Sequence, residues 1–357
     1  MVFLATSSRT FFTASEAPPT SSHTGSPENL LKGFRMNNSS IRNESCDNID
    51  FSLDQTFLPV LYGLVFCIGL PTNCLALYGL YRLVRTDNAL PVYVINLLLS
   101  DLLQISTLPL WIDYYSHGHV WRFGNTLCEI TGVIFWICQS VSIFFMLCVA
   151  LERYIAVSHP LCFRSQCRLK YTCLLCVFAW LLAILGITMS FQVGFTNTAD
   201  WLCFEKYPSN KQFCVLRLGT ITLCFPLPLI LLVGLYGGTW RNINQAVSVT
   251  DCEKKKITKL LLLLVVIFVL VFGPYHIVGY VKFFGLMILG DSCDYEARIF
   301  IYFQIGMGIL SLNSLLDPFL YIFVCRDVRK EMLDSFPCFQ KLASERELWK
   351  IIRSAKT

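Results

Sequence analysis

Seven stretches of the chain are almost free of charged residues, and each is long enough to cross a membrane as a helix. A helix rises about 1.5 Å per residue and the apolar core of a bilayer is about 30 Å thick, so about 20 apolar residues suffice. Proline and glycine interrupt several stretches, which membrane helices tolerate. We therefore predict seven transmembrane helices, at about Phe57–Leu83, Leu90–Ser116, Asn125–Ser158, Tyr171–Phe191, Phe213–Trp240, Ile257–Leu289 and Glu296–Val324.

Two polar regions flank these stretches. Residues Met1–Asp54 are rich in Ser, Thr, Pro and Asn and poor in large apolar side chains, which predicts a disordered tail. In Cys325–Phe336, apolar residues recur at helical spacing opposite basic ones, which predicts an amphipathic helix on the membrane surface. We divide the chain into a tail (1–56), a transmembrane unit (57–324) and a surface helix with its own tail (325–357).

Composition and charge placement agree with a membrane protein. Hydrophobic residues make up 55% of the chain and charged residues 15%, whereas soluble domains carry about 25% charge. Lys and Arg follow the first, third and seventh stretches and lie between the fifth and sixth, while acidic residues gather in the opposite loops. The positive-inside rule then predicts a multi-pass plasma-membrane protein with its amino terminus outside. The basic run Lys254–Lys256 predicts contact with anionic lipid, and no pattern typical of nucleic-acid binding is present.

Both ends of the chain carry candidate modification sites. Cys338, beside the predicted surface helix, is a candidate for palmitoylation, with an unmodified cysteine as the alternative. The tail leaves open whether translation starts at Met1 or Met36. It also contains overlapping or adjacent sequons that predict glycosylation of Asn37, Asn38 and Asn43.

Polar residues inside the predicted helices are the main functional signal, because a polar group in hydrocarbon is costly and is usually retained for function. In chain order they are Gly69-Leu70-Pro71-Thr72-Asn73, Asn96-Leu97-Leu98-Leu99-Ser100-Asp101, Glu152-Arg153-Tyr154, Trp180, Pro228 with Tyr236, Phe272-Gly273-Pro274-Tyr275 and Asp317-Pro318-Phe319-Leu320-Tyr321. This ordered set resembles that of the rhodopsin-like (class A) G-protein-coupled receptors, over roughly Phe57 to Cys338. The resemblance implies an all-α bundle of seven transmembrane helices with a short eighth helix.

Small departures narrow the resemblance. Glu152, Phe272 and Asp317 stand where the family commonly has Asp, Trp and Asn. The Phe and Asp variants resemble a branch that holds receptors for protons, nucleotides and lipid mediators. Further segments resemble the proton-sensing group: Leu108-Pro109-Leu110-Trp111-Ile112-Asp113-Tyr114, Cys203-Phe204-Glu205-Lys206-Tyr207-Pro208, Pro274-Tyr275-His276, Cys293-Asp294-Tyr295-Glu296-Ala297-Arg298 and Ser311-Leu312-Asn313.

The resemblance implies two disulfides on the outer face. Cys128 and Cys203 would tie the loop between helices four and five to helix three. Cys46 and Cys293 would join the tail to the loop between helices six and seven, as in the proton-sensing group. We expect Cys214 to be a free cysteine within helix five.

The membrane interior contains two carboxylates, Asp101 and Asp317, which cannot stay ionised there without a cation or another partner. The family favours a sodium ion at Asp101, with Ser142, Asn313 and Ser314 supplying further oxygens. Two alternatives stay open: a carboxylate pair that shares one proton, and a hydrated polar plug with no role in signalling. We expect no other cofactor and no metal.

The resemblance also predicts a switch that couples to a heterotrimeric G protein. In the resting state Glu152 would hold Arg153. We expect this contact to be weak, because the start of helix six carries basic residues and no acidic partner for Arg153. On activation Arg153 would turn toward Tyr236 and Tyr321. We expect Pro274 to kink helix six and Phe272 below it to act as a toggle; Tyr154 and Pro318 belong to the same motifs.

The predicted ligand pocket is lined by Tyr62, Trp111, Tyr115, Phe135, Gln139, Tyr275, His276, Phe303, Gln304 and Met307, with Glu205 and Lys282 at its rim. Phe135 stands where amine receptors carry an Asp, so an amine ligand is not expected.

Protons are the leading ligand class, because histidine titrates near pH ~6.5. His117, His119 and His276 are expected to face outward, although five histidines in the whole chain are few for a sensor. The carboxylates of Asp101, Asp317 and Glu205 would carry part of the response. The alternatives are a lipid mediator such as a lysophospholipid, or another ligand not yet assigned.

Other function classes fit less well. A transporter or channel would need a polar path or inverted repeats, and neither is visible. An intramembrane enzyme would need a nucleophile or metal motif such as His-Glu-x-x-His, which is also not visible, so we do not expect an enzyme.

Overall fold

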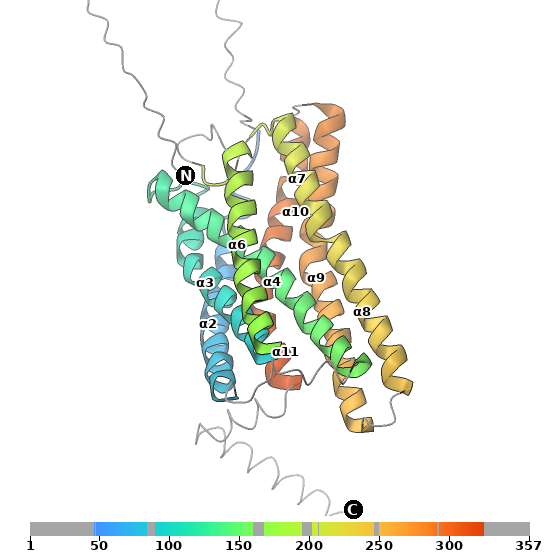
Figure 1. The fold of residues 1–357 in the computed structure, drawn as a ribbon. Helices are drawn as coiled ribbons and strands as arrows, with labels where there is room; N and C mark the ends of the chain where they lie inside the picture. The colour runs from blue at the N-terminus through green and yellow to red at the C-terminus, as the bar shows by residue number, and fades with distance from the viewer. Residues whose placement is uncertain are drawn as a thin grey trace, which may run out of the picture. The chain divides into compact units, whose positions relative to one another are not determined.

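The computed structural model describes residues 46, 48–83, 90–159, 168–194, 202–205, 207–245, 250–290 and 293–324. Within these ranges the secondary structure is helical and contains no strand, as Figure 1 shows. The helices belong to a compact unit that spans residues 45–357. They are α2 (Phe57–Leu83), α3 (Leu90–Ser116), α4 (Asn125–Ser158), α6 (Arg168–Gly194), α7 (Lys211–Cys224), α8 (Pro226–Gln245), α9 (Asp251–Leu289), α10 (Cys293–Ser311) and α11 (Asn313–Val324).

Seven spans of the described chain are long and apolar enough to cross a membrane, which confirms the predicted fold. Two of them consist of two helices each. The fifth breaks at Phe225, between α7 and α8, because Pro226 has no N–H and disfavours a helical conformation in the residue before it. The seventh breaks at Leu312, where a tighter turn bonds Leu312 N to Ile309 O at 3.0 Å.

The start of α9 differs from the prediction at Ile257 because a capping box extends the helix. The Thr250 hydroxyl accepts from Glu253 N at 3.4 Å, and the Glu253 carboxylate accepts from Thr250 N at 3.2 Å. This pair satisfies free N–H groups of the first turn. The basic run Lys254–Lys256 therefore lies within the helix.

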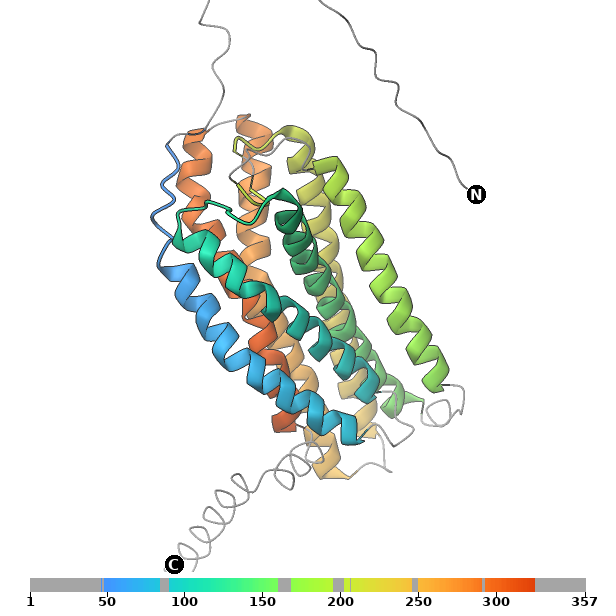
Figure 2. The same ribbon diagram turned by 90° about the vertical axis from the view of Figure 1, so that its left-hand side faces the viewer.

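Helix α4 is the centre of the bundle. In its apolar span 67% of the residues are buried, against 17% in the span of α6, so α6 presents most of its apolar surface to lipid. The largest core cluster gathers around α4 and includes Phe135, Phe145 and Met146. At the periphery of the bundle, α2 packs against α3 and α11, as the turned view in Figure 2 shows.

Both predicted disulfides form, Cys46–Cys293 and Cys128–Cys203. They lie at the same end of the bundle, which we call the disulfide end. Cys214 is buried in α7 and takes part in no disulfide within the described residues, as predicted. The sequons, Cys338 and the predicted surface helix lie outside the described residues.

Candidate functional site

A stretch of the tail, residues 48–56, packs across the disulfide end. The Cys46–Cys293 bond joins it to the first residue of α10, and Asn48 Nδ2 donates to Asp294 Oδ1 at 2.6 Å. Further along, Gln55 Nε2 donates to Ser116 O at 2.8 Å. The predicted disorder of the tail through Asp54 is therefore wrong for this stretch, because a covalent bond and buried polar contacts hold it in place.

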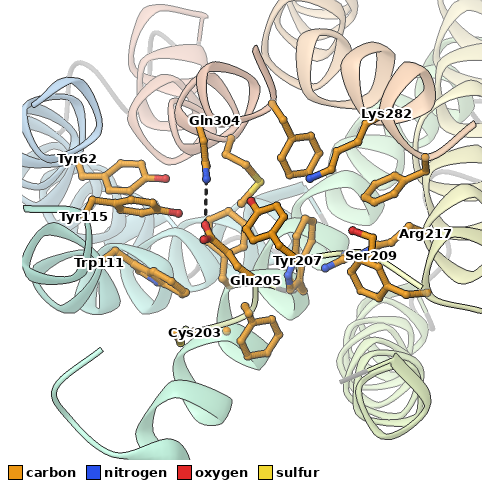
Figure 3. A pocket seen from close by; sticks show the side chains of 18 of the residues that line it. Tyr62, Trp111, Tyr115, Cys203, Glu205, Tyr207, Ser209, Arg217, Lys282 and Gln304 are labelled. Carbon is orange, nitrogen blue, oxygen red and sulfur yellow. Dashed lines mark hydrogen bonds between the residues drawn. The ribbon is translucent and has the colours of Figure 1, made fainter. Parts of the chain in front are cut away.

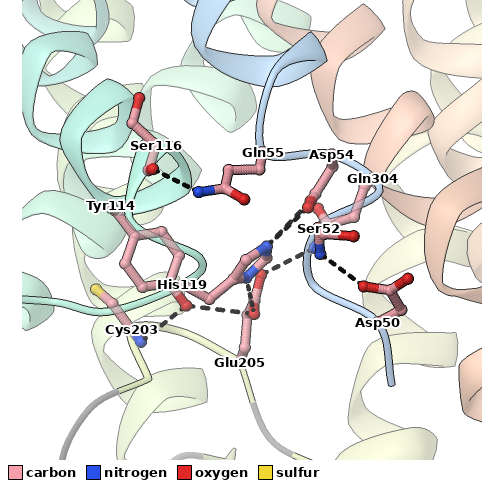
Figure 4. Close-up of polar contacts among 10 residues, drawn as sticks. All are labelled: Asp50, Ser52, Asp54, Gln55, Tyr114, Ser116, His119, Cys203, Glu205 and Gln304. Carbon is pink, nitrogen blue, oxygen red and sulfur yellow. Dashed lines mark hydrogen bonds and ion pairs between the residues drawn. The ribbon is translucent and has the colours of Figure 1, made fainter. Parts of the chain in front are cut away.

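His119 connects the tail to the loop that follows α6. Its Nε2 lies 3.0 Å from Asp54 Oδ1, and its Nδ1 lies 2.7 Å from Glu205 Oε2 (Figure 4). The side chains of His119 and Asp54 have no exposed surface, and that of Glu205 is 12% exposed. We call these three residues the titratable cluster. Because both ring nitrogens face carboxylates, both donate hydrogen bonds when the ring is an imidazolium.

The charges of the cluster shift one another's pKa values. Burial lowers the pKa of His119, but the charge of Glu205 and the bonds to both carboxylates outweigh it and raise the pKa to about 9. Burial raises the pKa of Glu205, yet the His119 charge and the bonds from His119 and Gln304 lower it overall. For Asp54, burial outweighs the His119 contact and raises the pKa. His119 therefore has the highest proton affinity of the three.

Backbone geometry brings Glu205 and His119 together. The Cys128–Cys203 bond fixes the loop, and Tyr114 accepts from Cys203 N and donates to Glu205 Oε2, both at 3.3 Å. Gln304 of α10 donates to Glu205 Oε1 at 2.9 Å. His119 itself has a φ of 63°, a conformation that is uncommon outside glycine.

Gly132 of α4 makes room for the same loop. A Cβ at this position would lie 2.0 Å from the Phe204 ring. The ring therefore packs directly against the helix backbone, and only glycine permits that approach.

The other two candidate histidines are not in the cluster. His117 is exposed, and its Nδ1 donates to Asp113 O at 2.8 Å. His276 is buried in α9, where Nδ1 donates to Phe272 O at 2.6 Å and the ring stacks on Phe225. Its apolar surroundings face the bundle interior, so it is not exposed as His117 is.

A cavity with an empty volume of about 760 Å³, open mouth included, lies beside Glu205 (Figure 3). Most of the predicted lining is present: Tyr62, Trp111, Tyr115, Phe135, Glu205, Lys282, Phe303, Gln304 and Met307. The remaining predicted residues, Gln139, Tyr275 and His276, line an adjacent cavity. Trp136, Phe204, Tyr207, Phe213 and Arg217 also line the first cavity but were not predicted. Of these, Arg217 could have been found, because a cation within an apolar helix is itself a signal.

A polar core lies deeper, where Asp101 of α3 and Asp317 of α11 are both fully buried. Asn313 Nδ2 donates to Asp317 Oδ2 at 3.2 Å, and Asn73 Nδ2 donates to Ser314 O at 2.7 Å. Within the described residues, several buried oxygens have no hydrogen-bond partner: both of Asp101, Oδ1 of Asp317, Oδ1 of Asn313, Oγ of Ser314 and Oδ1 of Asn73. The remaining predicted oxygen ligand, Ser142, instead pairs with the Ser100 hydroxyl at 3.1 Å.

The end of α4 opposite the disulfide end carries Glu152, which is buried, and Arg153, which is half-buried. The Tyr154 ring packs against Gly238 of α8, and Tyr236 lies beside Trp240 with ring centroids 6.4 Å apart. Tyr321 belongs to α11, but its side chain lies outside the described part of the chain.

Pro274 and Phe272, the residues of the predicted switch in helix six, lie within the continuous helix α9. The Phe272 ring is buried and stacks on Phe268 at 5.0 Å. Pro318 is buried in α11. The signalling roles of these residues stay predictions.

Comparison with known proteins agrees with this architecture. Residues 72–321 match the family model of the "7 transmembrane receptor (rhodopsin family)". The chain is 31% identical over 291 residues to G-protein coupled receptor 68 of Homo sapiens, covering 81% of this chain and 78% of the relative. It is 29% identical over 292 residues to human G-protein coupled receptor 183, covering 77% and 80%. Human probable G-protein coupled receptor 132 is 29% identical over 295 residues, covering 81% and 76%.

Together, the seven spans, the paired disulfides and these matches show that the chain belongs to the rhodopsin family of G-protein-coupled receptors and is a multi-pass protein of the plasma membrane.

Proposed function

We propose that this receptor senses extracellular acidity and passes the signal to a heterotrimeric G protein, with the disulfide end facing outside. Two arguments support the orientation. Disulfides form in oxidising compartments, and both lie at this end. Basic residues follow the first, third and seventh spans on the other side, as the positive-inside rule requires of the cytoplasmic face.

The observation that carries the proposal is the burial of His119 between Asp54 and Glu205. The pKa of His119 rises from 6.5 to about 9 in this paired conformation. A raised pKa means that the paired conformation binds the proton more tightly, so it is fully stabilised below pH ~6.5 and loses that stabilisation as the pH rises toward about 9. Acidification across the physiological range therefore favours pairing.

The neighbouring groups do not reverse this direction between about pH 6 and 8. The raised pKa of Asp54 means that its protonation also favours the paired conformation. Glu205 acts the other way, because its lowered pKa makes pairing weaker only in stronger acid, below its ordinary value of 4.5. Tyr114 and Tyr207 also face the cluster. Burial raises the pKa of Tyr207 well above its ordinary value near 10, so Tyr207 stays neutral in this range. His119 is therefore the group that responds first.

The titratable cluster is connected to a membrane helix. His119 holds the tail through Asp54 and holds the loop after α6 through Glu205, and Glu205 in turn bonds Gln304 of α10. A proton taken up at His119 thus strengthens a connection between two external segments and a membrane helix. Helix α10 leads directly into α11, which carries Asp317.

We propose that the polar core binds a sodium ion, which would supply positive charge to the buried Asp101 and Asp317 carboxylates. The buried oxygens without hydrogen-bond partners, on Asp101, Asp317, Asn313 and Ser314, are the hard ligands that such a cation prefers. Ser142 is the weakest candidate ligand because its hydroxyl already forms a hydrogen bond with the Ser100 hydroxyl.

At the cytoplasmic end, Arg153 is the residue that we expect to engage the G protein, next to the buried Glu152 and the packed Tyr154. The movement of α9 around Pro274 would open that surface, with Phe272 as its pivot. These roles come from the family to which the chain belongs.

The proposal is tested by measuring cAMP and calcium in cells that express the receptor, between about pH 6 and 8. We expect a pH-dependent response in the native receptor, and a flattened response in His119→Gln, which keeps hydrogen bonding but loses the charge. The matched control is His117→Gln, on the same loop but exposed. Flat curves for both messengers would contradict the proton proposal and favour the lipid-mediator alternative, while an unchanged response in His119→Gln would remove His119 from the sensor.

A further inference from the structure

We infer that the cavity beside Glu205 binds an organic anion with an apolar body, and that Lys282 and Arg217 hold its anionic group. This site goes beyond the proton response proposed above, because it requires a second, molecular ligand. Both cations line the cavity on the side away from Tyr62 and Tyr115 (Figure 3).

Lys282 of α9 is a buried cation without an anion. Its side chain is 4% exposed, and it forms no ion pair or hydrogen bond with the residues that the structure describes. Its ammonium lies 4.4 Å from the centroid of the Phe303 ring and 5.1 Å from that of Tyr207. Contact with aromatic faces compensates for only part of the lost hydration of an ammonium. The position therefore favours an anionic partner.

The nearby carboxylates are already engaged. Glu205 accepts from His119 and Gln304, and Glu296 accepts from Ser209 N at 3.1 Å. Both carboxylates attract the Lys282 ammonium from a distance, but within the described residues neither forms a direct ion pair with it.

Arg217 of α7 adds a second cation beside the first. Its guanidinium lies over the Trp136 ring at 4.7 Å and over the Phe213 ring at 5.1 Å. A guanidinium stacked in this way presents its N–H groups in a fixed plane, which suits a carboxylate, sulfate or phosphate. Two cations from different helices thus converge on the same side of the cavity.

The rest of the lining fits an apolar body. Tyr62, Trp111, Tyr115 and Phe135 contribute aromatic surface, and a mostly apolar lining with a few polar groups is typical of ligand sites. The Glu205 carboxylate repels a second negative charge. The ligand is therefore a molecule with one anionic end toward α7 and α9 and an apolar end toward α2 and α3, whether a fatty acyl lipid or a soluble aromatic acid.

The test uses the purified full-length receptor in a neutral detergent, with thermal unfolding followed at about pH 7.4. Dodecanoate and dodecanol form the lipid pair of probes, and naphthaleneacetate and naphthaleneacetamide the soluble pair. We expect at least one acid to raise the unfolding temperature in a saturable manner while its neutral partner does not. The acid that binds identifies the source of the ligand; equal effects of acid and neutral partner, or no effect of any probe, would overturn the inference.

Variants separate binding from folding. Lys282→Met, which keeps chain length without the charge, should weaken acid binding at least about tenfold, Lys282→Arg should retain it, and Arg217→Met should weaken it. Lys211→Met, at the exposed start of α7, is the matched control and should bind normally. Unchanged acid binding in Lys282→Met would contradict the site, and so would unchanged binding in Arg217→Met.

A second measurement needs no ligand. If Lys282 lacks an anion in the free receptor, Lys282→Met should unfold at the native temperature or above it, because it removes an uncompensated buried charge. A fall of several degrees would show an internal partner and refute the inference. Because these measurements use one pH and no signalling, their failure is separate from that of the proton proposal.

Discussion

Replacing His119 by glutamine keeps a hydrogen-bonding side chain between Asp54 and Glu205 but removes its positive charge. In the native protein the pKa of His119 rises from 6.5 to about 9 on pairing, so below pH ~6.5 this proton stabilises the paired conformation by about 3 kcal/mol. From about pH 7.4 to about pH 6.4, linkage shifts the equilibrium toward pairing by about fivefold, or ~1 kcal/mol. We expect His119→Gln to lose this shift.

Hydrogen exchange of the tail measures the shift directly. Amides in residues 48–56 should exchange about five times more slowly at the lower pH once the intrinsic pH dependence of exchange is removed. His119→Gln should show nearly equal protection at both pH values, and the His117→Gln control should behave like the native protein. If His119→Gln keeps the full fivefold change, the proton is taken up elsewhere and our reasoning about the titratable cluster is wrong.

Three further predictions concern other parts of the molecule. Arg153→Ala should abolish G-protein activation while surface expression, measured by antibody labelling, stays normal; retained signalling would contradict its role. Gly132→Ala places a Cβ 2.0 Å from the Phe204 ring and should cost about 1–3 kcal/mol, seen as a lower unfolding temperature, whereas Gly186→Ala, with open space around it, should not. Asp101→Asn should remove any stabilisation by sodium over choline in the same assay, and equal stabilisation in the variant would exclude the site.

The helices could be predicted because each depends on a local pattern of about 20 apolar residues. The break at Phe225 follows from the proline after it, so it could have been predicted from the sequence. The contacts at the titratable cluster were not, since His119 lies 65 residues from Asp54 and 86 residues from Glu205. Their meeting depends on how the tail and loops fold over the bundle.

The site residues also differ in this respect: their types could be read from the sequence, but their contacts could not. His119 and Glu205 were identified by type, as a titratable residue and an acid at the predicted rim. Asp54 was assigned to a disordered tail because its neighbours are polar, and nothing in that composition shows that a disulfide and a histidine would bury it. His276 was placed in the outer part of helix six and in the pocket lining, but the sequence does not show which neighbouring side chains surround it there.

The bond between Cys46 and Cys293 has a practical consequence for anyone who handles the purified receptor. A protease that nicked the backbone once between Asn48 and Asp54 would leave both pieces covalently joined. The damaged molecule would run as a single band in electrophoresis without reductant and would separate only after reduction. Preparations meant for acid titrations should therefore be checked on reducing gels, since a nicked sample would otherwise pass as intact while its pH response is impaired.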